Sequence, residues 1–249
     1  MNQTTLSAPV ALITGAARRI GAAIAWHLHQ KGFRVVIHFN HSSQEAKALA
    51  LTMNKNKDNS AQALQADLTI KNACYQLVSE TVHWGKRLDL LVNNASFFKR
   101  TDVSNPSEAD WNKLFDTNVR APFWLSHASK PYLAKQRGCI INITDIHAEK
   151  PLKDYTVYCQ SKAALTMQTK SLAREFAPMI RVNGVAPGAI SWPEGENTLS
   201  EALQKKIIAQ TPLNIHGDPT FIAHAVLAIV ENPFITGEIL HVDGGRRLI

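Results

Sequence analysis

Tyr158, Lys162 and Asp145 are the residues whose types and spacing indicate chemistry. Tyr158 and Lys162 are four positions apart, so in a helix they share one face, where the ammonium favours the phenolate and makes the tyrosine a better acid. A tyrosine at its ordinary pKa of about 10 would release a proton slowly at neutral pH. Asp145 adds a carboxylate thirteen positions before Tyr158. The three residues predict proton delivery to a substrate that accepts a hydride, although Tyr-x-x-x-Lys alone is also typical of an ordinary exposed helical pair.

A glycine turn between an apolar run and a helical pattern predicts a dinucleotide site. The apolar run at residues 10–14 is followed by Gly15 and Gly21. Gly15 allows a tight turn, and Gly21 lets the helix approach the sheet, so that free N–H groups at the helix N-terminus point at a pyrophosphate. Arg18 and Arg19 add positive charge beside the phosphates, with a solvated helix start as the other interpretation, chiefly for Arg18.

The residues after the second apolar run, 34–38, favour NADPH over NADH. Proteins that bind NAD hold the ribose with an acid about 20 residues past the glycine turn, and that carboxylate would repel the 2′-phosphate of NADP. These positions hold Asn40, His41 and Ser42 instead. Their polar groups, with Arg19 nearby, suit a phosphomonoester.

The chain resembles the short-chain dehydrogenase/reductases along nearly its whole length. The matching residues are Thr14-Gly15 with Arg19 and Gly21, Ala66-Asp67-Leu68, Asn93-Asn94-Ala95-Ser96, Asn118, Asp145 with Tyr158 and Lys162, Asn183-Gly184-Val185-Ala186-Pro187-Gly188, and Val242-Asp243-Gly244-Gly245. Within this superfamily it is most similar to the pteridine reductases and the bacterial dihydromonapterin reductases. Three departures from the majority pattern carry that narrower resemblance: Arg19 and Ser96 each replace a glycine, and Asp145 replaces a serine.

The resemblance implies a role for each matching residue. It makes Asp145, Tyr158, Lys162 and Asn118 catalytic, with Lys162 on the nicotinamide ribose hydroxyls and Asn118 relaying protons to it through water. The implied cofactor contacts are Gly15, Arg19, Ile20, Gly21, Asn40, His41, Ser42, Asp67 (at the adenine edge), Leu68, Asn94, Ala95, Tyr158, Lys162, Pro187 and Gly188. The implied substrate contacts are Arg19, Ser96, Phe98, Asp145, Tyr158 and Trp192.

Aromatic residues and a polar segment are expected around the substrate. By resemblance, Phe98 stacks on a pterin ring, with the adjacent Phe97 as the alternative. Residues 189–210, which follow Pro187-Gly188, have the composition of a mobile substrate lid. Trp192 in this segment either lines the pocket or anchors the segment to the body of the protein.

The carboxylate of Asp145 favours reduction of a C=N bond. A carbonyl under reduction develops alkoxide charge, which a serine hydroxyl stabilises and an ionised aspartate repels. A C=N bond is reduced most readily when its nitrogen is protonated, and a carboxylate either stabilises that cation or passes a proton through Tyr158. Asp145 could also cap the strand end or pair with Arg19. We predict NADPH-dependent reduction of a pterin or folate substrate, with two alternatives: a carbonyl reductase acting on a 3-oxoacyl, sugar or steroid substrate, and a non-catalytic NADP(H) sensor.

Length and patterning predict one α/β domain over residues 1–249. Apolar strand-like runs at 10–14, 34–38, 61–66, 88–93, 139–144, 181–186 and 239–242 alternate with helical patterns. This alternation predicts a Rossmann-type, doubly wound, seven-stranded parallel sheet with helices on both faces. The resemblance implies a homotetramer, with helices at 106–135 and 155–177 forming one interface, the C-terminal strand another, and residues 246–249 reaching a neighbouring subunit's site.

Composition argues against several other classes of protein. The formal charge of +7 is scattered, with no basic stripe interleaved with aromatics, so nucleic-acid binding is not expected. The ten histidines contain no His-x-x-x-His pattern, so no metal site is expected. Three cysteines without paired spacing favour reduced thiols in the cytoplasm. The N-terminus lacks a basic region followed by an apolar core, and no apolar run approaches about 18 residues, so neither secretion nor membrane spanning is expected.

Overall fold

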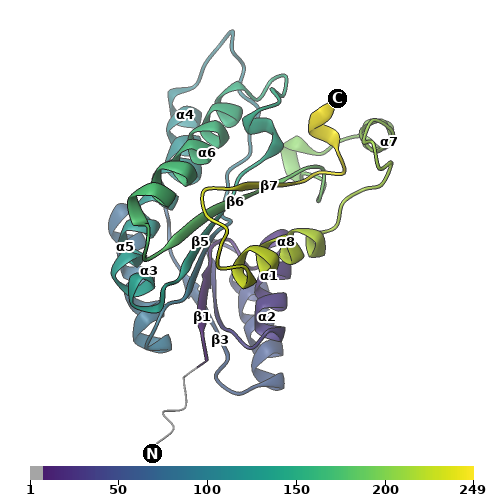
Figure 1. The fold of residues 1–249 in the computed structure, drawn as a ribbon. Coiled ribbons are helices and arrows are strands. Elements are labelled where there is room, and N and C mark those ends of the chain that lie inside the picture. Colours follow the sequence, from purple (N-terminus) through teal and green to yellow (C-terminus); the bar gives the residue numbers. More distant parts are fainter. Residues whose placement is uncertain (1–7) are drawn as a thin grey trace, which may run out of the picture.

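Seven parallel strands form one sheet in the computed structural model, which describes residues 8–249 (Figure 1). The first residues of the chain, on which the expectation about secretion depends, therefore lie outside the described part. The strands are β1 (Val10–Ile13), β2 (Arg34–Phe39), β3 (Ala61–Gln65), β4 (Leu90–Asn93), β5 (Cys139–Ile143), β6 (Arg181–Pro187) and β7 (Ile239–Val242). Their order in the sheet is β3-β2-β1-β4-β5-β6-β7. The predicted Rossmann-type fold is confirmed, and each strand lies within two residues of its predicted ends.

Helices cover both faces of this sheet. The helical elements are α1 (Arg19–Gln30), α2 (Ser43–Asn56), α3 (Lys71–Gly85), α4 (Glu108–Phe115), the π-helical turn η1 (Asp116–Arg120), α5 (Ala121–Gln136), η2 (Ile146–Ala148), α6 (Thr156–Phe176), η3 (Gly195–Asn197), α7 (Glu201–Ala209), α8 (Pro219–Glu231) and η4 (Arg246–Leu248). Helices α1, α2 and α8 lie on one face and α3, α5 and α6 on the other (Figure 1). None of the described helices is long and apolar enough to cross a membrane.

Burial on both faces explains why the central strands are continuously apolar. In β1, Val10 and Leu12 pack into the cluster under α3, α5 and α6, whereas Ala11 and Ile13 pack into the cluster under α1, α2 and α8. Successive side chains of a strand point to opposite faces, so a strand covered on both sides needs apolar residues at every position. The sheet is therefore rigid at its carboxyl edge, where the loops that carry the predicted site residues begin.

The segment predicted as one helix at 106–135 is divided into α4, η1 and α5. The π-helical turn contains Asn118, which is buried at 1% exposure. Such turns are rare and occur often at functional sites, because the extra residue rotates the side chains that follow. The sequence pattern does not reveal this turn, since the apolar spacing on either side is still that of a helix.

Candidate active site

The glycine turn after β1 is shaped by close backbone packing. Gly15 has a φ of +59°, and a Cβ there would lie 3.0 Å from the Cα of Ala95. At Gly21 a Cβ would lie 2.5 Å from the side-chain nitrogen of Asn94, so both positions require glycine. Arg19 has a φ of +56°, where a left-handed backbone costs a residue other than glycine on the order of 1–2 kcal/mol. Conformational strain of this kind is typical of functional sites.

Thr14 joins the glycine turn to the loop after β4. Its hydroxyl oxygen accepts the backbone N–H groups of Asn94 and Ala95, both at 2.9 Å. The side-chain amide of Asn94 donates to the carbonyls of Thr14 and Gly15 at 2.9 and 3.0 Å. These hydrogen bonds hold the two loops together.

His38, which the sequence analysis missed, supports the same turn from β2. Its Nδ1 accepts the backbone N–H of Gly15 at 3.0 Å, and its Nε2 lies 3.1 Å from the carbonyl oxygen of Ala66. Because a carbonyl only accepts, Nε2 carries the proton and Nδ1 is free to accept. Burial lowers the pKa of His38 to about 4, so the ring is neutral at physiological pH. The sequence does carry a signal for this role, because His38 is a polar side chain within the buried, largely apolar strand β2.

Polar residues without an acid follow β2, as the sequence shows. Asn40, His41 and Ser42 line the same cavity as the glycine turn. Asp67, after β3, accepts the backbone N–H and the hydroxyl of Thr69 at 3.0 and 2.7 Å. These hydrogen bonds hold the pKa of Asp67 below its usual range, with a smaller contribution from the nearby His41. This end of the cavity therefore presents neutral and basic donors beside one ionised carboxylate.

Asp145 and Tyr158 are in direct contact. The Tyr158 hydroxyl donates to Oδ2 of Asp145 at 2.6 Å, and Oδ1 of Asp145 accepts the backbone N–H of His147 at 2.8 Å. The aspartate thus caps η2 with one oxygen and holds the phenol with the other. The alternative pairing of Asp145 with Arg19 is not observed.

The guanidinium of Arg19 reaches the predicted lid. Its Nη2 donates to the carbonyls of Ser191 and Trp192 at 3.0 and 2.8 Å. The indole of Trp192 stacks on His216, with ring centroids 4.3 Å apart, and also lines the cavity. Both roles left open for Trp192 are therefore compatible with its position.

The pKa of Tyr158 is shifted in the direction opposite to the one expected from the sequence. Burial, followed by the charge and hydrogen bond of Asp145, raises the pKa of Tyr158 well above its ordinary value. The ammonium of Lys162 lies 5.8 Å from the centroid of the tyrosine ring and donates to the carbonyl of Ile143 at 3.0 Å. Burial lowers the pKa of Lys162 to about 8, against an opposing effect of Asp145. The expected lowering of the Tyr158 pKa by Lys162 is wrong, because the carboxylate is the direct partner of the hydroxyl.

Asn118 ties the π-helical turn to two other elements. Its Nδ2 donates to the carbonyl of Phe97 and to the hydroxyl of Ser161, both at 3.0 Å. Its Oδ1 accepts the Ser96 hydroxyl at 3.2 Å and the Phe97 N–H at 2.8 Å. Ser161, which the sequence analysis missed, donates in turn to the carbonyl of Tyr158 at 2.7 Å. The amide group therefore positions the loop after β4 against α6, and the predicted water relay stays a prediction.

Phe98, rather than Phe97, is the aromatic ring beside Tyr158. It meets Tyr158 edge-on at 4.7 Å between centroids and stacks on Tyr155 at 4.5 Å. Phe97 instead lies under the ammonium of Lys113, 4.4 Å from the ring centroid. Tyr155, another residue missed from the sequence, extends the aromatic surface next to Tyr158.

The predicted lid touches this aromatic surface through Asn197. The Tyr155 hydroxyl donates to Oδ1 of Asn197 at 3.0 Å, and Nδ2 of Asn197 donates to the carbonyl of Phe98 at 3.1 Å. Within the predicted lid, residues 201–209 form helix α7. The lid is therefore more regular than its composition indicated, and its mobility stays a prediction.

One cavity of about 1700 Å³ joins these features. It is lined by all the predicted site residues except Asn118, which is buried behind it. The residues fit a nicotinamide dinucleotide. The glycine turn at the start of α1 suits a pyrophosphate, the end of β2 offers donors, and the buried Lys162 lines the same cavity beside Tyr158.

Comparisons with known proteins agree with this site. A family profile described as Enoyl-(Acyl carrier protein) reductase matches residues 15–247. Pteridine reductase 1 of Leishmania tarentolae is 35% identical over 288 aligned residues, covering 98% of this chain and 98% of that protein. The 3-oxoacyl-acyl-carrier-protein reductase FabG of Staphylococcus epidermidis is 35% identical over 239 residues, covering 94% of this chain and 97% of that protein. FabG of Staphylococcus aureus is 34% identical over 239 residues, covering 94% of this chain and 96% of that protein. Matches of this length and identity show that the chain belongs to the short-chain dehydrogenase/reductase superfamily, as a reductase that uses NAD(P)H.

Proposed function

We propose that the protein reduces a C=N bond of a dihydropterin or dihydrofolate-type substrate with NADPH. The observation that carries the proposal is the 2.6 Å hydrogen bond from Tyr158 to Asp145, with the ring of Phe98 against the same tyrosine. A carboxylate at the proton donor suits a substrate that becomes positively charged during reduction and disfavours one that becomes negatively charged. An aromatic surface beside it suits a flat heteroaromatic ring.

The chain's own residues supply the proton side of the reaction. The cofactor, when bound, supplies the hydride that adds to the carbon, while the nitrogen of the C=N bond takes a proton. The carboxylate of Asp145 stabilises the protonated nitrogen. The raised pKa of Tyr158 keeps its phenol protonated at neutral pH, so that it acts as a hydrogen-bond donor and proton conduit. Lys162, buried on the same helix face, is placed to hold the ribose hydroxyls.

NADPH is proposed over NADH because of the residues after β2. Asn40, His41 and Ser42 offer donors to a 2′-phosphate, and no carboxylate follows the strand to bind the hydroxyl of NAD. Arg19 lines the same cavity and adds positive charge, whereas Arg18, which also lines it, pairs with Glu194 at 3.6 Å and with Glu45 at 4.0 Å. These groups together favour the additional phosphate of NADPH.

A carbonyl reductase acting on a 3-oxoacyl thioester is the second candidate. It is favoured by the FabG relatives, whose identity to this chain is close to that of the pteridine reductase. The same fold and the same Tyr158 and Lys162 serve both reactions. Asp145 disfavours this candidate, because its charge would oppose the developing alkoxide. We set aside the non-catalytic sensor, since the chain belongs to a family of reductases.

A substrate panel tests the proposal. Oxidation of NADPH is followed by its absorbance with 7,8-dihydrobiopterin, dihydromonapterin and dihydrofolate, beside a 3-oxoacyl thioester, a sugar and a steroid ketone. We expect turnover with at least one dihydropterin at a kcat/KM more than about a hundredfold above that for any ketone. A reversed preference would establish the carbonyl reductase instead.

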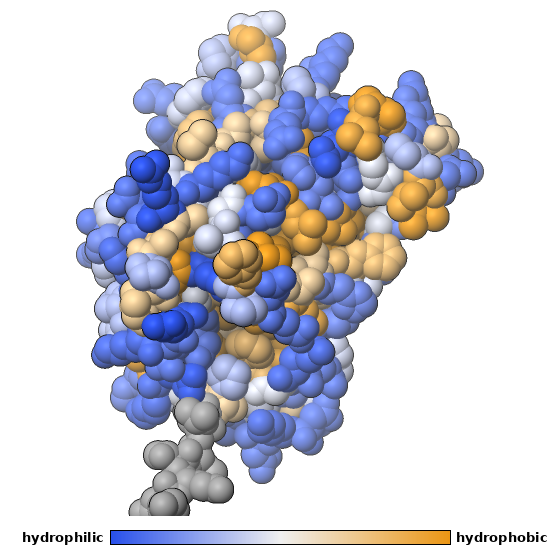
Figure 2. Space-filling model, in the orientation of Figure 1, coloured by the Kyte–Doolittle hydropathy of each residue, from blue (hydrophilic) through white to orange (hydrophobic). Residues whose placement is uncertain are grey.

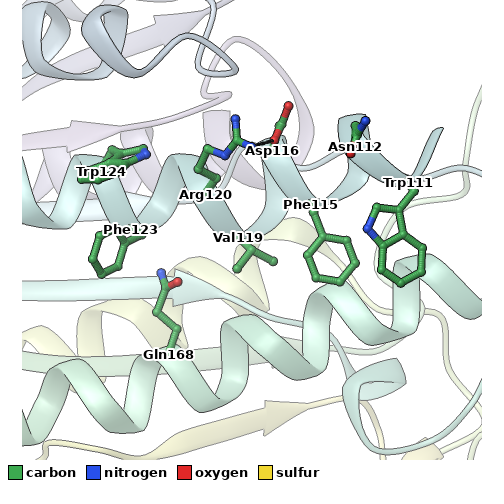
Figure 3. Close-up of a pocket in the computed structure, with 9 residues that line it drawn as sticks. All are labelled: Trp111, Asn112, Phe115, Asp116, Val119, Arg120, Phe123, Trp124 and Gln168. Carbon is green, nitrogen blue, oxygen red and sulfur yellow. Dashed lines mark ion pairs between the residues drawn. The ribbon is translucent and has the colours of Figure 1, made fainter. Parts of the chain in front are cut away.

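We also propose a homotetramer, because two apolar surfaces coincide with the expected interfaces. The first is a groove of about 410 Å³ between the α4–α5 segment and α6, where Phe115, Val119 and Phe123 project toward the helix that carries Gln168 (Figure 3). The second lies along α8 and β7, where Phe221, Phe234 and Leu240 are exposed, and Figure 2 shows apolar side chains among polar ones over this region. Light scattering should give four subunits, and Phe123→Glu combined with Phe234→Glu should reduce this mass, whereas Leu51→Glu should not.

A further inference from the structure

We infer that Arg246 binds a carboxylate at the end of the substrate away from the reduced bond. The inference rests on the proposed function, since it concerns a substrate bound beside Asp145. It makes Arg246 a specificity residue that favours dihydropterins with an acidic tail over dihydropterins without one. Four features of the described residues support it.

The first feature is the position of Arg246 in the wall of the active-site cavity. Its side chain lines the cavity from η4, and Lys206 of α7 and the following Gln210 line the same cavity. One guanidinium nitrogen, Nη1, donates to the carbonyl of Ile207 at 3.0 Å. The guanidinium is thus held at the cavity by one hydrogen bond, and among the described residues its other N–H groups have no hydrogen-bond acceptor.

The second feature is the rigidity of the segment that carries it. The carboxylate of Asp243 accepts the backbone N–H groups of Gly245 and Arg247 at 3.0 and 2.8 Å. The ammonium of Lys150 donates to the carbonyl of Arg246 at 3.0 Å and also contacts that of Ile249. A side chain on a backbone fixed in this way loses little further freedom when it binds a ligand. Arg246 therefore forms part of the wall of its own chain's cavity, and the expectation that residues 246–249 reach a neighbouring subunit's site stays a prediction.

The third feature is a connection from this wall to the catalytic carboxylate. The carbonyl of Lys150 accepts Nδ1–H of His147 at 2.8 Å, and the backbone N–H of His147 donates to Asp145. The same short loop thus anchors both Asp145 and the segment of Arg246. Arg246 is consequently linked to the Asp145 side of the cavity, whereas the cofactor's phosphates would be held by the glycine turn and Ser42.

The fourth feature is the absence of a counter-charge. Among the described residues, no acidic side chain forms an ion pair with Arg246. Burial lowers the pKa of its guanidinium, which shows that the charge is partly removed from water. A ligand carboxylate would supply the missing charge and could accept two parallel N–H bonds from the fork of the guanidinium.

Arg246→Gln and Arg246→Lys test this inference with two matched substrates. 7,8-Dihydrofolate carries a glutamate tail, whereas 7,8-dihydrobiopterin has no carboxylate. We expect Arg246→Gln to raise KM for dihydrofolate about tenfold and to leave KM for dihydrobiopterin within about twofold. Arg246→Lys should recover part of the loss, because it keeps the charge without the fork. Arg247→Gln, an exposed neighbour outside the cavity lining, is the control and should change neither KM.

Direct binding separates this inference from the proposed function. Dissociation constants of both dihydropterins are measured calorimetrically on the NADP⁺-loaded wild type and on Arg246→Gln. Selective weakening for dihydrofolate supports the inference even if wild-type turnover of both compounds is absent and the proposed function fails. An equal change for both compounds, or no change for either, would overturn it, since Arg246 would then only support α7 through Ile207. In wild type, higher ionic strength should weaken dihydrofolate binding more than dihydrobiopterin binding.

Discussion

The hydroxyl of Tyr158 and the carboxylate of Asp145 lie 2.6 Å apart, with the hydroxyl donating to Oδ2. Both residues face one cavity, and the second carboxylate oxygen is held by the backbone of η2. The aspartate therefore has a defined orientation and is not an exposed charge that could turn away. Together with burial, this contact raises the pKa of Tyr158, and in the proposed reaction the same carboxylate favours a substrate that becomes positively charged.

Replacing Asp145 should separate the two candidate reactions. Asp145→Ser removes the charge and offers a hydroxyl, so we expect kcat/KM for a dihydropterin to fall about a hundredfold or more. Turnover of a ketone should rise in the same variant, because an alkoxide is no longer repelled. Asp145→Asn is the matched control, since it keeps the shape of the side chain and should lose dihydropterin turnover without gaining the serine hydroxyl. Unchanged dihydropterin kinetics in both variants would remove Asp145 from the mechanism.

The protonation of Lys162 should limit activity at alkaline pH. Burial lowers its pKa from 10.5 to about 8, so the folded protein carries this charge below pH 8 and loses it as the pH rises through that value. We therefore expect kcat/KM to fall by about tenfold per pH unit on the alkaline side. The pH profile of Lys162→Gln should be low and should lack this step. Lys170→Arg changes an exposed lysine of the same helix and should leave the profile as in wild type; a wild-type plateau extending past pH 10 would contradict the prediction.

His38 should control the affinity for NADPH through the glycine turn. His38→Leu leaves the N–H of Gly15 without its acceptor, which costs about 1–3 kcal/mol, so we expect KM for NADPH to rise by roughly tenfold or more. In His38→Asn, the asparagine Oδ1 replaces the histidine Nδ1 as acceptor of the Gly15 N–H. We therefore expect KM for NADPH to stay close to wild type. Both variants lose the bond to Ala66, so their difference isolates the contact with Gly15.

The substrate KM and the melting temperature provide the controls for His38. A general loss of packing would lower the melting temperature of both His38→Leu and His38→Asn. It would also raise KM for the dihydropterin and KM for NADPH alike. A positioning role predicts instead that only KM for NADPH separates the two variants. Equal values of this KM in Leu and Asn variants would show that the hydrogen bond to the turn does not matter for the cofactor.

A carboxylate at the end of β2 should weaken the proposed preference for NADPH. Asn40→Asp places a charge where an NAD-binding protein has one, and it would repel a 2′-phosphate. We expect the ratio of kcat/KM for NADPH to that for NADH to fall by at least about tenfold. Asn56→Asp makes the same charge change on an exposed residue outside the cavity and should leave the ratio unaltered. Comparable wild-type turnover with both cofactors would show that the polar residues after β2 do not select the phosphate.

The sequence by itself determined the sheet and the glycine turn. Strands covered on both faces must be apolar at every position, so their pattern is local and visible, as in β1. Gly15 and Gly21 are equally readable, because two glycines between a strand pattern and a helix pattern form a local motif. The absence of an acid after β2 is likewise a property of a few adjacent residues. These features depend on residues near one another in the chain, and propensity and spacing report on them directly.

Only the tertiary structure decided which groups are partners. Spacing placed Tyr158 and Lys162 on one helix face, but the loop after β5 brought Asp145 to the hydroxyl and raised the tyrosine's pKa. The contact between Asn197 and the carbonyl of Phe98 joins residues ninety-nine positions apart. Such contacts depend on how loops pack across the carboxyl edge of the sheet. A hydrogen bond between distant loops leaves no period in the sequence, because its geometry is set by all the elements that hold the two loops in place.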